Sequence, residues 1–394
     1  MRPLGPVVSV SPEGLLRSVS LVRSLPNGAV LVHDLTGRQV VLLDSLLLLR
    51  RTVLDTSAAS GAGYNSRIAG LIPYRGDSSL FIDPEALTMT VIDAAGETVR
   101  VMAIPRPRDA DFMIGGPFGT PGVDPLGRIV YRGFAPADRR GASTGPPEPG
   151  KPFIMPQPPD SAPIVRVDLR EKSIDTITWV KKPTERFEVR QTDKGFATTV
   201  RTNPMPVVDD WVLLADGRIA ALRGRDYHVD WFAPDGARSS TPKVPFGWQR
   251  MSDDDKVRLI DSANVAWQAE RERLNKQVNG GEGEGVPVGG AAMRAPPVRF
   301  QVPNYQPVDA KELADYRPAF RTGAMSVDTQ GRLWIRTTAL SDTGPVYDVV
   351  DASGTLVDRV RLPFGRVVSG FGPGVVYLGV LDDKGARLER ARIR

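Results

Sequence analysis

A short phrase that returns along the chain most strongly limits how it can fold. Each copy contains a turn with glycine, and a run of mostly apolar residues follows that glycine. Four clear copies contain Pro26-Asn27-Gly28, Asp124-Pro-Leu-Gly127, Asp216-Gly217 and Asp328-Thr-Gln-Gly331. Asp, Asn and Gly favour tight turns, and a short apolar run favours a strand. A turn-and-strand unit that returns along 394 residues predicts a repeat protein.

Two further phrases complete the repeating unit. In the second, an apolar run ends at an Asp-containing turn, as in Val91-Ile92-Asp93-Ala-Ala-Gly96 and Val349-Val350-Asp351-Ala-Ser-Gly354. In the third, an apolar residue precedes proline, as in Val244-Pro245 and Leu362-Pro363. Because the three phrases keep a constant order, each unit holds four antiparallel strands, which is one blade of a β-propeller.

The copies of the first phrase predict an all-β, six-bladed propeller that spans 1–394 as a single domain. The six copies lie around Gly28, Asp77, Gly127, Gly217, Gly331 and Gly372. The last unit is short, and we expect the segments Val7–Val10 and Leu15–Val19 to complete it and to protect its edge. Five and seven blades stay open, because Phe196–Val200 fits either an outer strand of blade three or a loop.

Two insertions interrupt the repeat. Residues 133–163 are dense in Pro and Gly and predict an extended loop, because proline continues neither a helix nor a central strand. Residues 251–318, between blades four and five, begin with a predicted helix that Ser252 and Asp255 cap. We expect it to lie over one face of the propeller as a lid or partner surface, and we expect the Gly-rich run after Asn279 to be flexible. Its predicted packed stripe consists of residues at alternating spacings of three and four: Val257, Ile260, Asn264, Trp267, Arg271 and Leu274.

Composition excludes several kinds of site. The chain has no cysteine, which excludes disulfides, thiolate metal sites and cysteine nucleophiles. The net charge of +5 comes from interleaved basic and acidic residues, which argues against a nucleic-acid partner. No apolar stretch approaches the roughly 20 residues of a transmembrane segment. The first residues lack the apolar core of a signal peptide, and we expect a monomer.

The main candidate site is the mouth of the central channel. Residues just before each innermost strand line this mouth in a propeller, and they include the uncharged Gly115-Gly116-Pro117. Charges that converge there would form a funnel for a polar or anionic ligand, whereas the alternative is that they pair with one another. Asp209 and Asp210 also offer oxygen ligands to Ca²⁺. The charged candidates are Arg67, Asp209, Asp210, Arg321 and Arg366.

A secondary candidate surrounds one of the two histidines. Alternation along Arg225–Trp231 places Asp226, His228 and Asp230 on one face of a strand. These groups suit a metal, or they orient His228 as a general base. The alternative that we favour is a hydrogen-bonded ladder between neighbouring blades. For His33 we expect a structural, hydrogen-bonded role.

Several segments resemble a family of uncharacterised bacterial six-bladed propellers. Leu25-Pro-Asn-Gly-Ala-Val-Leu-Val-His-Asp34 looks like the start of a blade in NHL-like and TolB-like propellers. The more specific likeness lies in Leu71–Phe81, Asn203–Trp211, Arg225–Trp231 and Arg366–Gly372. The resemblance implies the fold and a periplasmic or secreted location, whereas a native start at Met1 implies the cytoplasm. It implies no activity.

The sequence therefore favours a non-enzymatic propeller that binds a polar or anionic small ligand, or another envelope protein, at the channel mouth. No phosphate-binding loop, nucleophile elbow or zinc-protease motif is present in the sequence. The alternative is a metal-dependent hydrolase or lyase of the lactonase type, with the metal held by Asp209 and Asp210. A redox quinoprotein ranks third, because no cofactor motif supports it.

Overall fold

The computed structural model describes most of the chain and shows a protein built from strands. It describes residues 2–393 except 58–62, 65, 146–147, 149–150, 152, 193–194, 280–303 and 340. The predicted flexible run after Asn279 lies outside these residues, as does most of Gly145–Gly150. Among the helices in the described ranges, none combines the length and apolar character that a membrane crossing requires.

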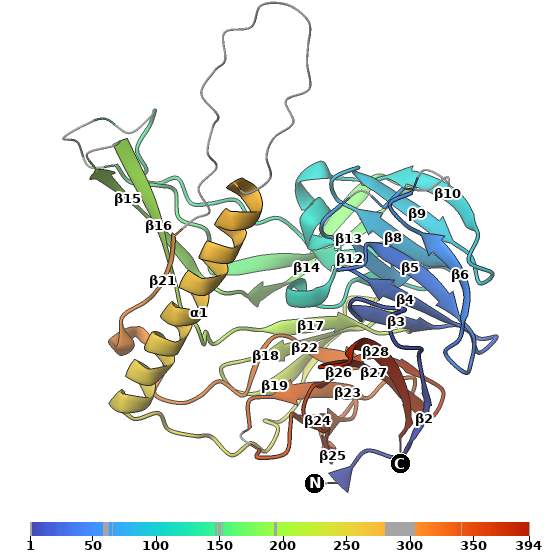
Figure 1. Cartoon of the computed structure of the whole chain (residues 1–394). Helices are drawn as coiled ribbons and strands as arrows, with labels where there is room; N and C mark the ends of the chain where they lie inside the picture. The colour runs from blue at the N-terminus through green and yellow to red at the C-terminus, as the bar shows by residue number, and fades with distance from the viewer. Residues whose placement is uncertain are drawn as a thin grey trace, which may run out of the picture.

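Within the described residues, six sheets share one topology, in which four antiparallel strands run from a first to a fourth position (Figure 1). Sheet 1 is β3 (Leu21–Ser24), β4 (Val30–Asp34), β5 (Gln39–Leu43) and β6 (Leu49–Leu54). Sheet 2 is β7 (Gly70–Pro73), β8 (Ser79–Asp83), β9 (Thr88–Ile92) and β10 (Thr98–Ala103). Sheet 3 is β11 (Gly122–Val123), β12 (Ile129–Arg132), β13 (Ser161–Asp168) and β14 (Ser173–Lys181).

The remaining three sheets follow the same order. Sheet 4 is β17 (Asp210–Leu213), β18 (Ile219–Arg223), β19 (His228–Phe232) and β20 (Arg238–Ser240). Sheet 5 is β22 (Phe320–Val327), β23 (Leu333–Thr337), β24 (Val346–Val350) and β25 (Leu356–Arg361), with β1 (Arg2–Pro3) added in parallel. Sheet 6 is β26 (Arg366–Gly372), β27 (Val375–Asp382), β28 (Gly385–Arg392) and β2 (Val7–Val10).

The recurring phrases form the same hairpin turn. At Asp328, the backbone N–H donates to the carbonyl of Arg332 at 3.0 Å, and the N–H of Gly331 donates back to the carbonyl of Asp328 at 3.0 Å. Asp351 repeats this pattern with Thr355 and Gly354. The glycines have φ of +77° and +84°, a left-handed conformation that other residues adopt at a cost. A turn followed by a left-handed glycine is a preferred hairpin connection, so local chemistry explains the repeat.

Apolar side chains pack between each pair of neighbouring sheets and close them into a ring. Leu31 of sheet 1 packs with Phe81 of sheet 2, and equivalent clusters join sheets 2 to 3, 3 to 4, 4 to 5 and 5 to 6. A further cluster joins Val32 of sheet 1 to Tyr377 of sheet 6. The first strands contact one another around the ring and are therefore the innermost strands. This arrangement confirms the predicted all-β propeller fold.

The N-terminal segment completes sheet 6. Strand β2 pairs antiparallel with β28, as we expected for Val7–Val10, and the two marked termini lie near each other (Figure 1). The expectation was wrong for Leu15–Val19, which forms no strand; Leu16 makes only an isolated bridge to Ala386. The backbone N–H groups of Arg17 and Ser18 instead bind a carboxylate of sheet 1.

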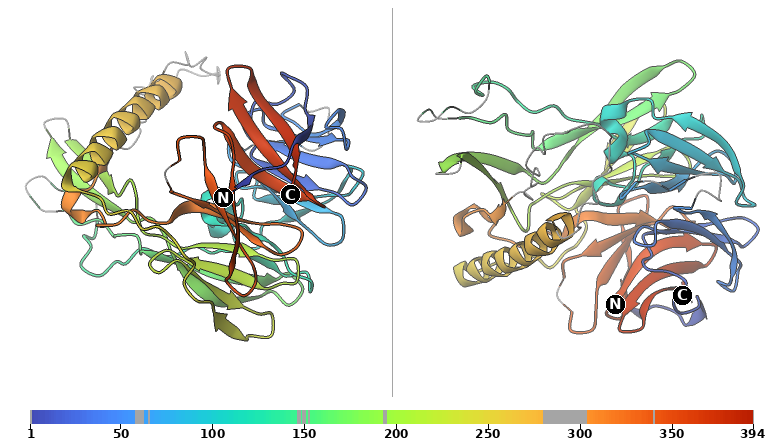
Figure 2. Two further views of the ribbon diagram at one scale, coloured as in Figure 1. Left: turned by 90° about the horizontal axis from the view of Figure 1, so that it is seen from below. Right: turned by 45° about the horizontal axis from the view of Figure 1, so that its top comes forward.

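A separate, accessory sheet contains Phe196–Val200, the segment that the sequence assigned to either an outer strand or a loop. Strands β15 (Glu185–Thr192) and β16 (Gly195–Thr202) pair antiparallel, and β21 (Asn304–Pro307) pairs parallel with β16. Phe196–Val200 therefore belongs neither to sheet 3 nor to a loop. The helix α1 (Asp253–Asn279) packs on β21 and on the short helix η4 (Ala310–Glu312), to one side of the propeller (Figure 2).

The helix begins as predicted, with a different packing stripe. The N–H of Asp255 donates to Ser252 Oγ at 3.2 Å, and the N–H of Ser252 donates to the Asp255 carboxylate at 2.9 Å, which is a capping box. Val257 is exposed, although the prediction placed it on the packed stripe. Lys256 is buried instead, because its Nζ pairs with Asp315 at 2.7 Å.

Candidate functional site

The predicted site residues lie at one end of the ring. In a sheet of four antiparallel strands, the fourth strand ends where the first strand of the next sheet begins. All connections between sheets therefore lie at the same end, which we call the connector end. Turns between second and third strands also lie there, so the insertions at 133–160, 182–209 and 241–319 all project from this end.

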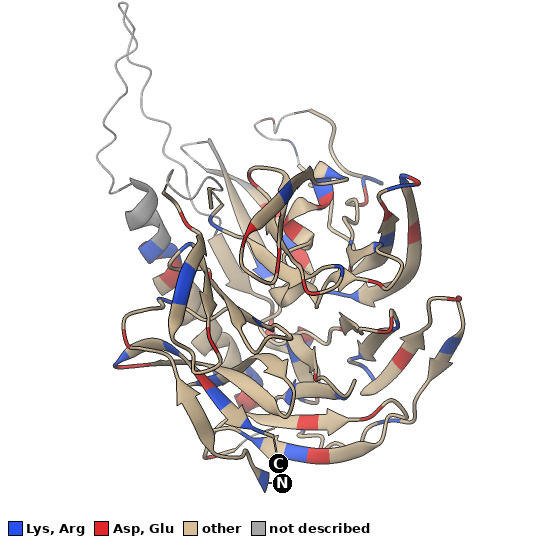
Figure 3. Cartoon of the chain, turned by 90° about the vertical axis from the view of Figure 1, so that its right-hand side faces the viewer, with Lys and Arg blue, Asp and Glu red and all other residues tan. Residues whose placement is uncertain are grey.

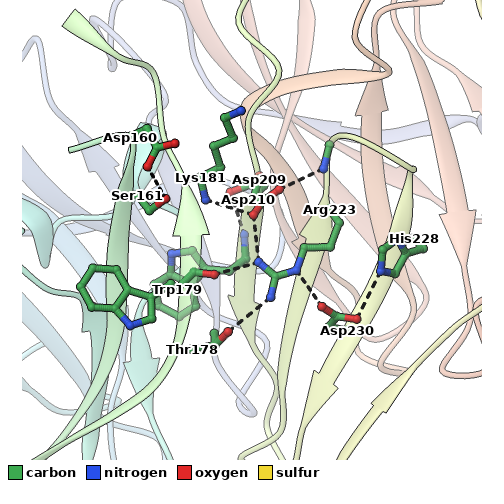
Figure 4. A network of polar contacts seen from close by, with 12 residues as sticks. Asp160, Ser161, Thr178, Trp179, Lys181, Asp209, Asp210, Arg223, His228 and Asp230 are labelled. Atoms are coloured by element: carbon green, nitrogen blue, oxygen red, sulfur yellow. Dashed lines mark hydrogen bonds and ion pairs between the residues drawn. The ribbon is translucent and has the colours of Figure 1, made fainter.

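Asp209 belongs to a network that ties sheet 4 to sheet 3 (Figure 4). Arg223 lies at the centre: its Nη1 donates to Asp209 at 2.8 Å, and its Nε donates to Asp230 at 2.7 Å. The same guanidinium donates to the carbonyl of Trp179 at 2.8 Å and to Thr178 Oγ1 at 3.3 Å. Arginine presents several donors in a fixed plane, and here they join two carboxylates to the neighbouring sheet.

His228 and Asp230 form the edge of this network. His228 Nε2 lies 3.3 Å from Asp230 Oδ1, and the other oxygen of Asp230 accepts from Arg223. The expectation for Asp226 was wrong, because residues 224–227 form a turn and β19 begins at His228. Asp226 instead pairs with Lys243 at 3.3 Å. The contacts are those of the hydrogen-bonded ladder between sheets that the sequence favoured.

Asp210 is buried between sheets 4 and 5. Its side chain accepts the N–H of Met325 at 2.9 Å and the N–H of Trp211 at 2.9 Å. The residue is 3 % exposed, and burial raises its pKa to about 7, against the backbone hydrogen bonds that lower it. Asp209 and Asp210 therefore point into separate networks and do not form a paired carboxylate site.

The connector before sheet 3 crosses the innermost strands. It contains η3 (Gly116–Phe118), which contacts β22 of sheet 5. The Trp211 indole Nε1 donates to the carbonyl of Phe118 at 2.7 Å. Arg132 stacks on this connector, with its Cζ 4.4 Å from the Phe118 ring centroid. The predicted mouth residues Gly115-Gly116-Pro117 thus pack against the inner strands of distant sheets.

Arg67 stands apart from the other candidates. Its side chain is exposed, and its backbone N–H donates to Glu85 at 3.1 Å. The neighbouring Ser66 is buried and donates its hydroxyl to Asp83. Among the described contacts, none joins Arg67 to Asp209, Asp210, Arg321 or Arg366, and Arg67 does not line the pocket described below.

A pocket of about 660 Å³ opens at the connector end between sheets 1, 5 and 6. We call it the Arg366 pocket. Arg17, Arg336 and Arg366 line it, and no acidic residue does. Its volume lies in the range of small-molecule sites. Hydroxyl groups from Ser18, Thr36, Thr337, Thr338 and Ser341 and apolar groups from Val19, Phe364, Val367, Val380 and Leu381 complete its lining.

Buried carboxylates hold two of its walls in place. Asp34 accepts the backbone N–H groups of Arg17 and Ser18 at 2.8 Å each, which fixes the connector that carries Arg17. Glu389 accepts two hydrogen bonds from Arg366, at 2.7 and 2.9 Å. The Arg366 charge is therefore already neutralised, whereas Arg17 and Arg336 form no ion pair with any residue in the described ranges.

Positive charge accumulates beside this pocket. Burial lowers the pKa of Arg321, and the like charges of Arg317 and Arg336 lower it further. These three guanidiniums thus lie near one another with no carboxylate paired to them in the part of the chain that the structure describes. In Figure 3, Lys and Arg are interspersed with Asp and Glu along the strands that face the viewer.

Among the described side chains, no group of three or more His, Asp or Glu residues is arranged to hold a metal ion. The chemistry that the Arg366 pocket offers is electrostatic attraction and hydrogen bonding from guanidiniums, together with apolar contact; the hydroxyls of Ser18 and Thr337 already donate to Asp34 and to the carbonyl of Val346. Guanidinium groups bind carboxylate and phosphate oxygens with good geometry.

Sequence reasoning missed Arg17, Arg336 and Phe364. A signal for Arg336 exists, because it is the fifth residue after the turn glycine Gly331. The equivalent residues are His33, Arg132 and Leu222, so this position varies in chemistry among the copies. It lies where the second strand ends, at the connector end of the ring.

Comparisons with known proteins find solved structures that resemble this chain at low sequence identity. No protein-family model matches the chain, and no curated protein matches it by sequence. A catalytically inactive virginiamycin B lyase from Staphylococcus aureus aligns over 98 % of this chain and 99 % of its own, with 8 % identity and a TM-score of 0.41. A gluconolactonase from Xanthomonas campestris aligns over 100 % and 99 %, with 13 % identity and a TM-score of 0.42. A member of the duf4221 family from Bacteroides vulgatus also aligns over 100 % and 99 %, with 9 % identity and a TM-score of 0.48. At these identities the similarity concerns the fold alone.

Proposed function

We propose that this propeller is a binding protein for a small anionic ligand, which it holds in the Arg366 pocket. One observation carries the proposal: Arg17 and Arg336 line a pocket without acidic residues, and neither has a carboxylate partner among the described residues. Arg336 also lies near the like charges of Arg317 and Arg321, and an anion would reduce the repulsion among them. Arg321 and Arg366, two of the five predicted mouth residues, extend and support this site.

Other parts of the original site prediction receive structural roles in this proposal. Asp209 and Asp210 join sheets, and the ladder of His228 and Asp230 does the same. Arg67 remains an exposed residue outside the pocket. The binding role therefore rests on the side of the ring where sheets 1, 5 and 6 meet.

Isothermal titration calorimetry with acetate, citrate and inorganic phosphate tests the proposal. We expect saturable binding of at least one of these anions at low salt, and weaker binding as salt increases. Substitution of both Arg17 and Arg336 by Gln should abolish it. The matched control is Arg50→Gln, which removes an exposed charge from β6, far from the pocket. Binding that survives in the double variant would refute the assignment, as would a failure of the unsubstituted protein to bind any anion, with or without an apolar tail.

The alternative remains a metal-dependent hydrolase or lyase of the lactonase type. It requires Asp209 and Asp210 to share a metal, and their separate hydrogen-bond networks argue against this arrangement. Metal analysis of the purified protein decides the matter. Stoichiometric Ca²⁺ that disappears in Asp209→Ala would favour the enzyme over the binding protein.

We infer further that the six sheets are the blades of one six-bladed domain spanning 1–394. The insertions at 133–163 and 251–318, with the β15–β16 hairpin, then form accessory structure on its connector end. The resemblance to NHL-like and TolB-like propellers supports this count and a periplasmic or secreted location. Limited proteolysis tests the domain assignment, because a single domain should resist cleavage between its sheets.

A further inference from the structure

The wall that sheet 6 contributes to the Arg366 pocket is apolar and exposed. Phe364 is 65 % exposed and Leu381 is 70 % exposed, and Val367 lies in the same lining. The N–H of Leu381 donates to the carbonyl of Gly365 at 3.2 Å, which keeps Leu381 beside the segment that carries Phe364. A single exposed apolar side chain is ordinary, whereas several that line one pocket indicate a binding surface.

The walls from sheets 1 and 5 have the opposite character. Sheet 1 contributes Arg17, and sheet 5 contributes Arg336. Arg366 lies on the sheet 6 side, but Glu389 already occupies its guanidinium. Charge available to a ligand is thus separated from the apolar wall, and the two kinds of surface face one pocket.

On the basis of the anion-binding function proposed above, we propose that the ligand is a monomeric amphiphilic anion. A carboxylate or phosphate head would bind Arg17 and Arg336, and an apolar chain or ring would pack on Phe364 and Leu381. A purely hydrophilic anion would leave the apolar wall in water, and an uncharged apolar ligand would leave the two guanidiniums unpaired. Both halves of the pocket are satisfied only by a molecule that carries both features.

The full chain is titrated by calorimetry with three kinds of probe. The first kind is a series of fatty acids from hexanoate to decanoate, each kept below its micelle concentration, with decyl phosphate as the phosphate arm. The second kind is the charged head alone, represented by acetate and inorganic phosphate. The third kind is an apolar tail with an uncharged head, represented by decyl maltoside. We expect affinity to increase by up to about four-fold for each methylene that is buried, and we expect the amphiphilic anions to bind at least ten-fold more tightly than either other kind.

Two sets of variants separate the halves of the site. Phe364→Ser and Leu381→Ser should remove the dependence on chain length while weak head binding remains. Arg336→Gln should reduce binding of decanoate at least ten-fold and should leave decyl maltoside unchanged. Leu126→Ser is the matched control, because Leu126 is 69 % exposed and lies in a turn outside the pocket.

The outcomes distinguish this inference from the function on which it rests. If no anion binds, with or without a tail, the anion-binding function itself is wrong. If acetate or phosphate binds as tightly as decanoate or decyl phosphate, or if Phe364→Ser and Leu381→Ser keep the chain-length dependence, only the amphiphile is wrong. Binding to vesicles of anionic lipid without binding to monomeric decanoate would also overturn it, in favour of a membrane surface.

Discussion

The buried carboxyl group of Asp210 makes the stability of the protein depend on pH in an unusual direction. Most carboxylates in folded proteins are stabilised by partners, so stability falls as they are protonated. Asp210 is buried and forms no ion pair with any residue that the structure describes, and burial raises its pKa from 3.8 to about 7. A raised pKa means that the ionised form is disfavoured in the folded state relative to the unfolded state.

The expected size of the effect on the free energy of unfolding follows from this pKa. Below about pH 4 the group is protonated in both states, and it contributes no penalty. Between pH 4 and 7 the unfolded chain loses the proton while the folded protein retains it, so stability falls as pH rises. At about 1.4 kcal/mol for each pH unit, the ionised group costs the fold about 4 kcal/mol above pH 7.

Asp210→Asn tests this reasoning, because asparagine keeps the shape and cannot ionise. Urea unfolding is followed from pH 4 to 8, and the fluorescence of the adjacent Trp211 provides the signal. We expect the free energy of unfolding of the variant, relative to the unsubstituted protein, to rise by several kcal/mol across this range. Asp111→Asn, at an exposed carboxylate, is the control and should follow the unsubstituted protein. A difference that stays within about 1 kcal/mol from pH 4 to 8 would show that Asp210 ionises without penalty.

Three further predictions concern how the sheets are joined. Arg223→Met should lower the free energy of unfolding by about 3 kcal/mol, measured by chemical denaturation, because it removes the guanidinium that pairs with both Asp209 and Asp230; an unchanged midpoint would contradict this. Gly331→Ala should cost about 1 kcal/mol in the same assay, since φ is +77° and the space is open, while Gly247→Ala, with open space and no positive φ, should be neutral. Deletion of residues 2–10 should lower Tm by about 5 °C or more in calorimetry, because sheet 6 loses its outer strand; an unchanged Tm would show that β2 adds no stability.

The repeat could be predicted from the sequence because its signals are local. A turn such as the one from Asp328 to Arg332 is closed by hydrogen bonds between residues at most four apart, so a few adjacent letters specify it. The order of such turns then specifies four strands. The same reasoning found β2, since a short final unit leaves an edge that needs a strand.

The candidate site could be predicted only in part, because its partners are distant in the sequence. Asp210 accepts a hydrogen bond from Met325, which is 115 positions away, and no sequence pattern near Asp210 predicts that contact. Asp209 and Asp210 do not converge on the channel mouth for this reason, because each carboxylate has a hydrogen-bond partner in its own or a neighbouring sheet. The sheet to which β16 belongs was missed for the same reason, because its parallel partner β21 begins only at Asn304.

The joint between β2 and β28 also determines the order in which the molecule can be completed. Leu388 donates its N–H to Ser11 across 377 positions of sequence. At equilibrium this sequence separation adds little to the free-energy cost of folding, because each doubling of the length of a closed loop costs only about 0.6 kcal/mol. During synthesis, at about 5–20 residues per second, the partner strand β28 is made on the order of 20–80 seconds after β2. Sheet 6 is thus the last of the six sheets to be finished, because its outer strand β2 is made long before its partner β28.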